Sequence, residues 1–209
     1  MIQEFLSVFI PLLIIVNPSS TLALFSAITH KYSKKERKIT AKNAVFYASI
    51  LLIIFAFAGA SILDYLNIEI YSLRIAGGIL LSFVGLDMVR RGEQFGESQP
   101  GKEQKVDYAL VPLAMPSLSG PGAITITIVS MKSLTINIPW FYAIIIAIIS
   151  ILITMLITYL IFMSSGLIIK ILGKKGMDAF TRVMGLLTVA IAVQFALTGI
   201  ADWITSINI

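Results

Sequence analysis

Two clusters of proline, glycine and small hydroxyl residues interrupt apolar stretches that are long enough to cross a membrane. The first cluster is residues 17–21, within 5–29, and the second is residues 116–122, within 108–129. Backbone that leaves a helix inside hydrocarbon persists only where it lines a cavity or is buried in protein, because each unsatisfied group is costly there. Paired interruptions of this kind are the best sequence indication of a transporter's binding site.

Each cluster has the residue order of a new helix start. Asparagine is a favoured N-cap and proline fits the first helical position, so Asn17-Pro18 predicts one start and Gly120-Pro121 the other, with Ser119 as an alternative cap. A helix start favours an anion, whereas the carbonyl end of the preceding half-helix favours a cation. We therefore expect substrate to bind at Asn17, Pro18, Ser19, Ser20, Thr21, Ser117, Ser119, Gly120, Pro121 and Gly122. The alternatives are that the prolines only kink their helices and that the hydroxyls bond to their own backbone.

By this interpretation, no Asp or Glu lies deep in a membrane-length stretch. A permanent cation or a proton relay normally uses an intramembrane carboxylate, so its absence favours a neutral or zwitterionic solute. A small neutral amino acid fits, with its carboxylate at a positive helix end and its amine at carbonyl groups. The coupling ion is open between Na⁺ and H⁺. With no cysteine and one histidine, His30, we expect no metal centre and no cofactor.

Four further polar residues are candidates for gates or for helix contacts. Asp87 stands four residues before Arg91, which favours an interfacial ion pair over a gate. Arg74 and Arg182 lie near the starts of their stretches, where snorkelling to the surface is favoured over gating. Gln194 is expected to bond a neighbouring helix, with substrate contact as the alternative.

Small residues recur at helical spacing in two of the apolar stretches. Gly78 and Gly85 lie in residues 71–89, and Ala192 and Ala196 lie in residues 177–204. Such residues let helix backbones approach closely within a membrane bundle. We expect them to form helix contacts.

The composition predicts an integral membrane protein with several spans. Of the 209 residues, 57% are hydrophobic and 13% are charged, more apolar surface than a soluble domain can bury. The six predicted spans are residues 5–29, 40–63, 71–89, 108–129, 140–163 and 177–204. The basic residues gather in the first, third and fifth connections, which the positive-inside rule places in the cytoplasm. We therefore expect a multi-pass protein of the cytoplasmic (inner) membrane with both termini outside, and we attribute the net charge of +5 to topology, not to nucleic-acid binding.

Short similarities indicate that the two halves repeat. Arg74-Ile75-Ala76-Gly77 pairs with Arg182-Val183-Met184-Gly185, and Asn17-Pro18 pairs with Gly120-Pro121. Three spans per half is an odd number, so the halves must have inverted topology. The predicted fold is all-α, with six transmembrane helices as two inverted three-helix repeats and with helices 1 and 4 discontinuous. Residues 1–91 form the first repeat, 92–107 a cytoplasmic linker and 108–209 the second repeat.

These motifs resemble the MarC family of six-span membrane proteins. The resemblance covers nearly the whole chain and rests on residues 16–18, 73–78, 111–117, 120–122, 182–185 and 194–195. It implies transport of small neutral amino acids such as glycine and alanine. It also implies that Asn17, Pro18, Gly120, Pro121 and Gly122 are binding candidates.

Two other functions are less well supported by the residues. A channel would use the two breaks as its constriction, but filters usually come from symmetric oligomers, and this chain has no repeated filter sequence. An intramembrane enzyme would need a base beside Ser119 or a second acid beside Asp87, and we find neither, so we expect no enzyme. No nucleotide-binding motif is present, which leaves secondary transport by alternating access between inverted halves. The oligomeric state is not indicated.

Overall fold

The computed structural model describes residues 1–29, 32–91 and 109–207, and these residues are almost entirely helical. The elements are α1 (Ile2–Val16), α2 (Pro18–Ile28), α3 (Lys34–Tyr65), α4 (Ile70–Arg91), η1 (Ala109–Leu118), α5 (Pro121–Asn137), α6 (Trp140–Met163) and α7 (Ser165–Ile207). The predicted linker at 92–107 and His30 lie outside the described residues, as do the side chains of Ser20 and Arg91.

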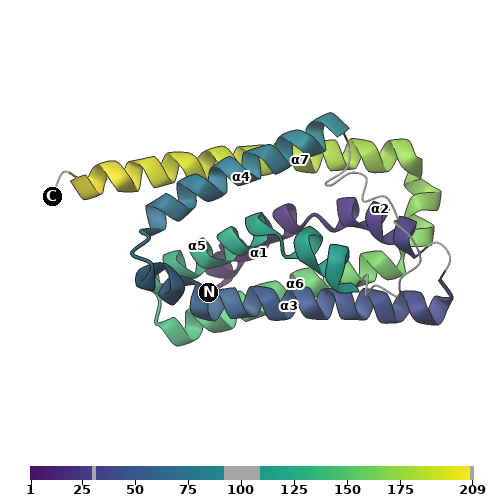
Figure 1. The fold of residues 1–209 in the computed structure, drawn as a ribbon, viewed down its shortest axis with the longest axis horizontal. Coiled ribbons are helices and arrows are strands. Elements are labelled where there is room, and N and C mark those ends of the chain that lie inside the picture. The colour runs from purple at the N-terminus through teal and green to yellow at the C-terminus, as the bar shows by residue number, and fades with distance from the viewer. Residues whose placement is uncertain (30–31, 92–108, 208–209) are drawn as a thin grey trace.

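The helices form three rows along the long axis of the molecule (Figure 1). Helices α4 and α7 lie side by side along one edge, and α3 and α6 lie along the opposite edge. The shorter elements α1, α2, η1 and α5 lie between these two pairs. This arrangement encloses the interrupted segments between continuous helices.

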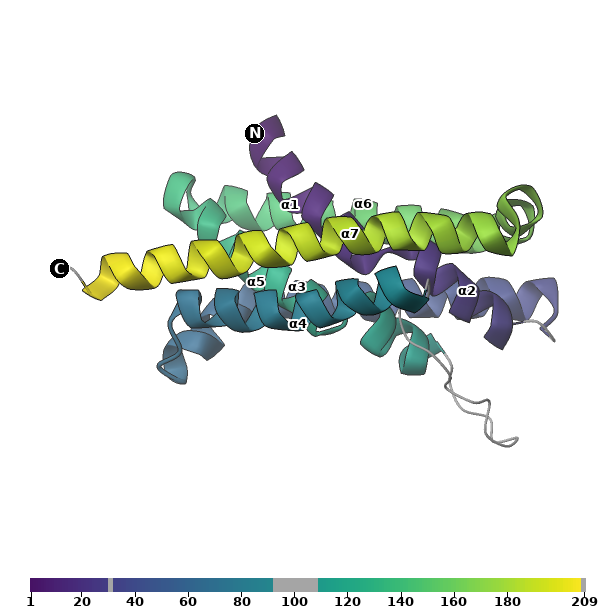
Figure 2. The same ribbon diagram turned by 90° about the horizontal axis from the view of Figure 1, so that it is seen from above.

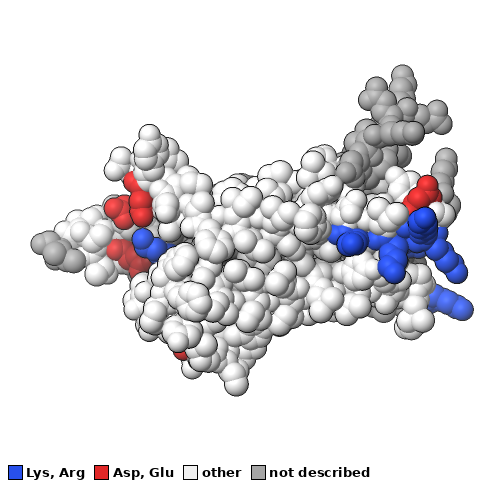
Figure 3. Space-filling model, turned by 90° about the horizontal axis from the view of Figure 1, so that it is seen from below, with Lys and Arg blue, Asp and Glu red and all other residues white. Residues whose placement is uncertain are grey.

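Within the described parts of the chain, four helices are long and apolar enough to cross a membrane: Lys34–Tyr65, Ile70–Arg90, Trp140–Met163 and Lys175–Ile207. Large apolar side chains such as Phe46 and Phe83 are exposed on their outer faces. Figure 3 shows Lys and Arg gathered mainly at one end of the molecule, and Asp and Glu mainly at the other. An apolar belt between charged ends is the surface expected of a protein embedded in a bilayer.

The other two predicted spans are broken near the predicted places. The first is divided into α1 and α2 at Asn17. The second is divided into η1 and α5 at Ser119 and Gly120, and η1 has non-helical backbone at Val111 and Met115. Each partner helix alone is shorter than the roughly 20 residues that a crossing requires.

Two of the predicted basic connections are helical. Ser33 begins α3 with a capping box, in which Ser33 Oγ accepts from the Glu36 N–H (3.3 Å) and Glu36 accepts from the Ser33 N–H (2.8 Å). This cap starts the helix before Lys35, so the basic residues of the first connection lie mostly on α3. The fifth connection belongs to α7, which bends at Gly173, where φ is +63°.

The predicted contact between small residues is confirmed at the α4–α7 pair. A Cβ placed on Gly78 would lie 2.7 Å from the Ala192 carbonyl oxygen, and one on Gly85 would lie 2.9 Å from the Gly185 carbonyl oxygen. Only helices whose backbones nearly touch give such distances. The pairs run in opposite order along the two helices, so α4 and α7 are antiparallel.

Candidate functional site

The first break is built around Asn17, whose backbone is left-handed (φ +42°, ψ +73°). Asn17 tolerates this conformation better than most residues. It occupies the N-cap position of α2, but its side chain makes no capping bond. Instead Asn17 Oδ1 accepts from Ser19 Oγ at 2.6 Å, and Asn17 Nδ2 lies 3.9 Å from Met88 Sδ in α4. Asn17 is the N-cap residue of α2, as predicted, although it makes no side-chain capping bond.

The second break also has an N-cap residue that is followed by a proline in the first turn of the next helix. Gly120 is the N-cap of α5, Pro121 occupies the first turn, and no side chain caps the helix. Ser119 is fully buried, and its hydroxyl donates to the Ala114 carbonyl oxygen at 2.8 Å, so it does not serve as the alternative cap. The first N–H groups of α5 therefore have no side-chain cap, which leaves the positive end of the helix dipole available to a ligand.

A pocket of about 230 Å³ lies beside this second break. Ser117, Gly120, Pro121 and Gly122 form one wall of the pocket, and residues of α4 form the opposite wall. Four of the ten predicted binding residues thus line a cavity. Asn17, Pro18, Ser19 and Thr21 do not line it, and Pro18 and Thr21 are buried in protein.

The two breaks are nevertheless neighbours in space. A Cβ placed on Gly122 would lie 3.3 Å from Ile15 Cγ2, and Ile15 is two residues before Asn17 and also lines the pocket. Asn17 contacts Met88 of α4, and the residue before Met88, Asp87, lines the pocket. The first break thus reaches the pocket through Ile15 and through α4.

Asp87 changes the expected electrostatics of the site. It lines the pocket together with Gly120 to Gly122, although the sequence pattern favoured an interfacial ion pair. No acidic residue was expected deep in a membrane-length stretch, and Asp87, four residues before the end of α4, brings a carboxylate to the pocket wall. The pocket presents a carboxylate on α4 and an uncapped helix start on α5, which are complementary to the two charges of a zwitterion.

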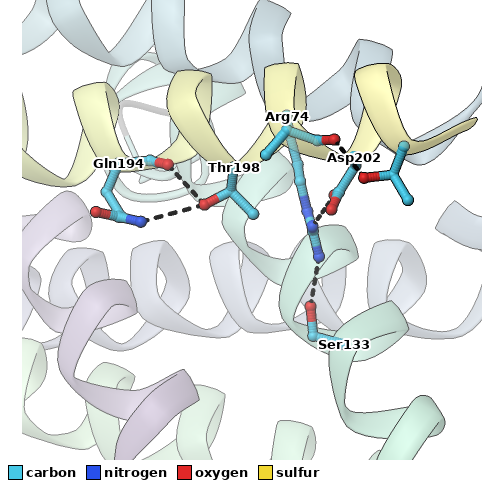
Figure 4. Close-up of polar contacts among 7 residues, drawn as sticks. Arg74, Ser133, Gln194, Thr198 and Asp202 are labelled. Atoms are coloured by element: carbon cyan, nitrogen blue, oxygen red, sulfur yellow. Dashed lines mark hydrogen bonds and ion pairs between the residues drawn. The ribbon is translucent and has the colours of Figure 1, made fainter. Parts of the chain in front are cut away.

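A second and larger pocket, of about 640 Å³, lies towards the acidic end. Arg74 and Ser133 line it, and Figure 4 shows the Arg74 guanidinium between Asp202 and Ser133. Arg74 Nη1 forms an ion pair with Asp202, and Nη2 donates to Ser133 Oγ at 2.8 Å. The Arg74 side chain is 13% exposed, so it does not snorkel to the surface but ties α4 to α5 and α7. Gln194 lines the same pocket and donates to Thr198 of its own helix at 3.2 Å, rather than to a neighbouring helix.

At the basic end the helices are packed closely. Phe25 of α2 and Phe162 of α6 are fully buried and stack with ring centroids 4.4 Å apart. The Arg37 guanidinium lies 5.3 Å from the Phe25 ring centroid and donates to Ser165. Further along this end, Arg182 donates to the Val89 carbonyl oxygen at 2.5 Å, which joins α7 to the end of α4.

Several of these residues carried no signal in the sequence analysis. Phe25 and Phe162 are ordinary members of apolar runs. Asp202 and Ser133 are 69 residues apart in number and meet only through Arg74. The available hint was the predicted inverted repeat, in which the start of one half's third span and the end of the other's would share one side of the membrane.

Helix lengths, apolar outer faces and charged ends define a multi-pass integral membrane protein. The sequence profile described as "MarC family integral membrane protein" matches residues 2–204. The chain therefore belongs to the MarC family, as the motifs indicated.

Its relatives cover almost the full length of the chain. A UPF0056 membrane protein of Methanocaldococcus jannaschii is 39% identical over 204 residues, 95% of this chain and 97% of that one. A UPF0056 membrane protein of Buchnera aphidicola is 37% identical, covering 94% and 91%. The UPF0056 inner membrane protein MarC of Citrobacter koseri is 31% identical, covering 91% of each. These names describe membrane proteins and state no enzymatic activity. No solved structure matches the chain.

Proposed function

We propose that this protein is a secondary transporter of small neutral amino acids such as glycine or alanine. The observation that carries the proposal is the 230 Å³ pocket between α4 and the uncapped start of α5. Its volume far exceeds the roughly 10–15 Å³ that one water requires, so a small amino acid fits in it. A substrate carboxylate faces the first turn of α5, and the amine faces Asp87.

The arrangement of the two pockets supports alternating access. Ile15 and Gly122 border the small pocket, whereas Pro11 and Ile126 border the large one. Pro11 lies four residues before Ile15 in α1, and Ile126 lies four residues after Gly122 in α5, which is about one helical turn in each case. The large pocket forms an access path towards the acidic end, and the Phe25–Phe162 stack closes the basic end. One open side and one closed side are what a transporter state requires.

Helix pairing supports an inverted repeat with six crossings. Segment α1 packs on α5, α3 packs on α6, and α4 packs on α7. The first and fourth predicted spans meet through α1 and α5, which lie on opposite sides of their breaks, and the other two pairs join corresponding helices of the two halves. In this proposal the interrupted segments α1–α2 and η1–α5 each cross the membrane as a composite, and both termini lie outside with the acidic end.

Uptake of labelled glycine and alanine into proteoliposomes tests the proposal. We expect substrate-dependent uptake that responds to an imposed Na⁺ or H⁺ gradient. Asp87 makes proton coupling testable, because Asp87→Asn removes the titratable group from the pocket wall. No substrate-dependent flux under either gradient would overturn the proposal, and single-channel currents would favour a channel.

A matched pair of glycine substitutions controls for general damage. A Cβ on Gly122 would lie 2.5 Å from Leu81 Cδ2, whereas nothing lies within 4 Å of one on Gly166. Gly122→Val should drive Leu81 and its own methyl groups into the pocket and lower uptake at least tenfold. Gly166→Val should leave uptake within about twofold of wild type.

A further inference from the structure

The 640 Å³ pocket has a polar wall that the proposed function does not use. Gln194, Thr198 and Asn137 line it with amide and hydroxyl groups, Arg74 adds a positive charge, and Glu4 adds a negative charge. Glu4 is paired with the N-terminal ammonium group. Arg74 is mostly buried beside this cavity, and its ion pair with Asp202 offsets the cost of burying the guanidinium group.

The two partners of Arg74 lie differently with respect to this pocket. Arg74 and Ser133 line it, whereas Asp202 does not. Nη1 is bonded to Asp202, whose side chain is 40% exposed, and Nη2 is bonded to Ser133 of the pocket wall. Nη2 thus has a neutral hydroxyl as its partner. A carboxylate there would make a charge-assisted bond, which is shorter and stronger than a bond to a neutral acceptor.

We infer that Arg74 and Ser133 form an outer docking site for the carboxylate of a small solute. The carboxylate accepts from Arg74 Nη2 and from the Ser133 hydroxyl, while Asp202 keeps Nη1 and holds the guanidinium in place. The Gln194 side chain, on the same wall, can accept from an amine. This site would be occupied before the solute reaches the pocket at Gly120 to Gly122, a sequence that rests on the proposed function.

Chemical modification of Arg74 tests the site without requiring transport. The purified full chain in nanodiscs is treated with phenylglyoxal, and mass spectrometry follows modification of Arg74 and of Arg182. We expect acetate and glycine, each in excess, to slow the modification of Arg74 at least threefold. Glycinamide, which lacks the carboxylate, should have no effect, and neither should an equal concentration of chloride.

Arg182 is the matched control because it also bonds across the α4–α7 pair, at the opposite end, and does not line this pocket. Its modification should be independent of all four additives. Equal slowing at both arginines would overturn the inference, as would an Arg74 rate unaffected by acetate and glycine. An Arg74 that never reacts would also overturn it, because a guanidinium open to small carboxylates must be open to the reagent.

Kinetics separate docking from a purely structural role. Lysine keeps the charge but not the planar fork, so Arg74→Lys should raise the KM for glycine about tenfold with little change in kcat. Ser133→Ala should weaken protection by acetate, and Arg182→Lys should change neither the KM for glycine nor the protection by acetate.

If wild type shows no uptake but Arg74 is protected, the proposed function fails and the docking site stands. If uptake occurs without protection, the docking site fails alone.

Discussion

At the scale of single residues, the breaks are specified by backbone conformation. Asn17 has φ +42°, and its side chain accepts from the Ser19 hydroxyl rather than from a backbone N–H of α2. An alanine in this conformation is strained, whereas glycine is not. Asn17 therefore has two separable roles, one in the backbone and one in its side-chain contacts.

Substitutions at Asn17 separate these roles. Asn17→Ala should lower the free energy of unfolding by about 1–2 kcal/mol, because it combines a left-handed alanine with the loss of the bond from Ser19. Asn17→Gly should lower it by less, since only the side-chain contacts are lost. Denaturation in detergent followed by circular dichroism measures both. A glycine variant less stable than the alanine variant would show that the left-handed backbone imposes no strain on alanine at this position.

At the scale of elements, α4 is the helix that connects every part of the site. It forms one wall of the small pocket, contacts Asn17 through Met88, and carries Arg74 at the larger pocket. Its opposite face lies against α7 at Gly78 and Gly85. A change in the α4–α7 contact should therefore alter both pockets together.

A leucine at Gly85 tests this dependence. The Cβ alone would lie 2.7 Å from Val189 Cγ2 and 2.9 Å from the Gly185 carbonyl oxygen, so the helices must move apart. We expect Gly85→Leu to cost about 1–3 kcal/mol of stability and to reduce uptake. Gly166→Leu, in open space, is the control and should be near neutral. Equal stability of the two variants in thermal unfolding would refute a close α4–α7 contact.

At the scale of the whole molecule, the charge distribution predicts which end faces the cytoplasm. The basic first turns of α3 lie at the end where Figure 3 shows most Lys and Arg, and α3 runs from that end to Asp64 near the other. Figure 2 shows α2 continuing along the long axis beyond α1. Such a path favours composite crossings over re-entrant hairpins.

Single cysteines can map this topology, since the chain has no cysteine of its own. Gln3→Cys and Asn137→Cys should react with an impermeant maleimide from outside intact cells. Lys35→Cys and Arg90→Cys should react only after permeabilisation. All four positions are exposed. Labelling of positions 3 and 35 from the same side would mean that the first interrupted segment is a hairpin.

The amino-acid sequence by itself determined the class of protein and the places of the breaks. Apolar length, basic clusters and the order Asn17-Pro18 and Gly120-Pro121 depend on local chemistry, because a helix in hydrocarbon must satisfy its own backbone and proline cannot continue one. The small residues Gly78 and Gly85 indicated a close contact for the same local reason. The family followed from these motifs.

Only the tertiary structure decided which residues surround a cavity. Asp87 looked interfacial and Arg74 looked able to snorkel, yet one lines the pocket at α5 and the other joins three helices. Ser119 looked like a cap and instead bonds the turn behind it. These outcomes depend on the direction each side chain takes after α4 packs between α7 and the breaks, and such long-range packing leaves no periodic pattern in the sequence.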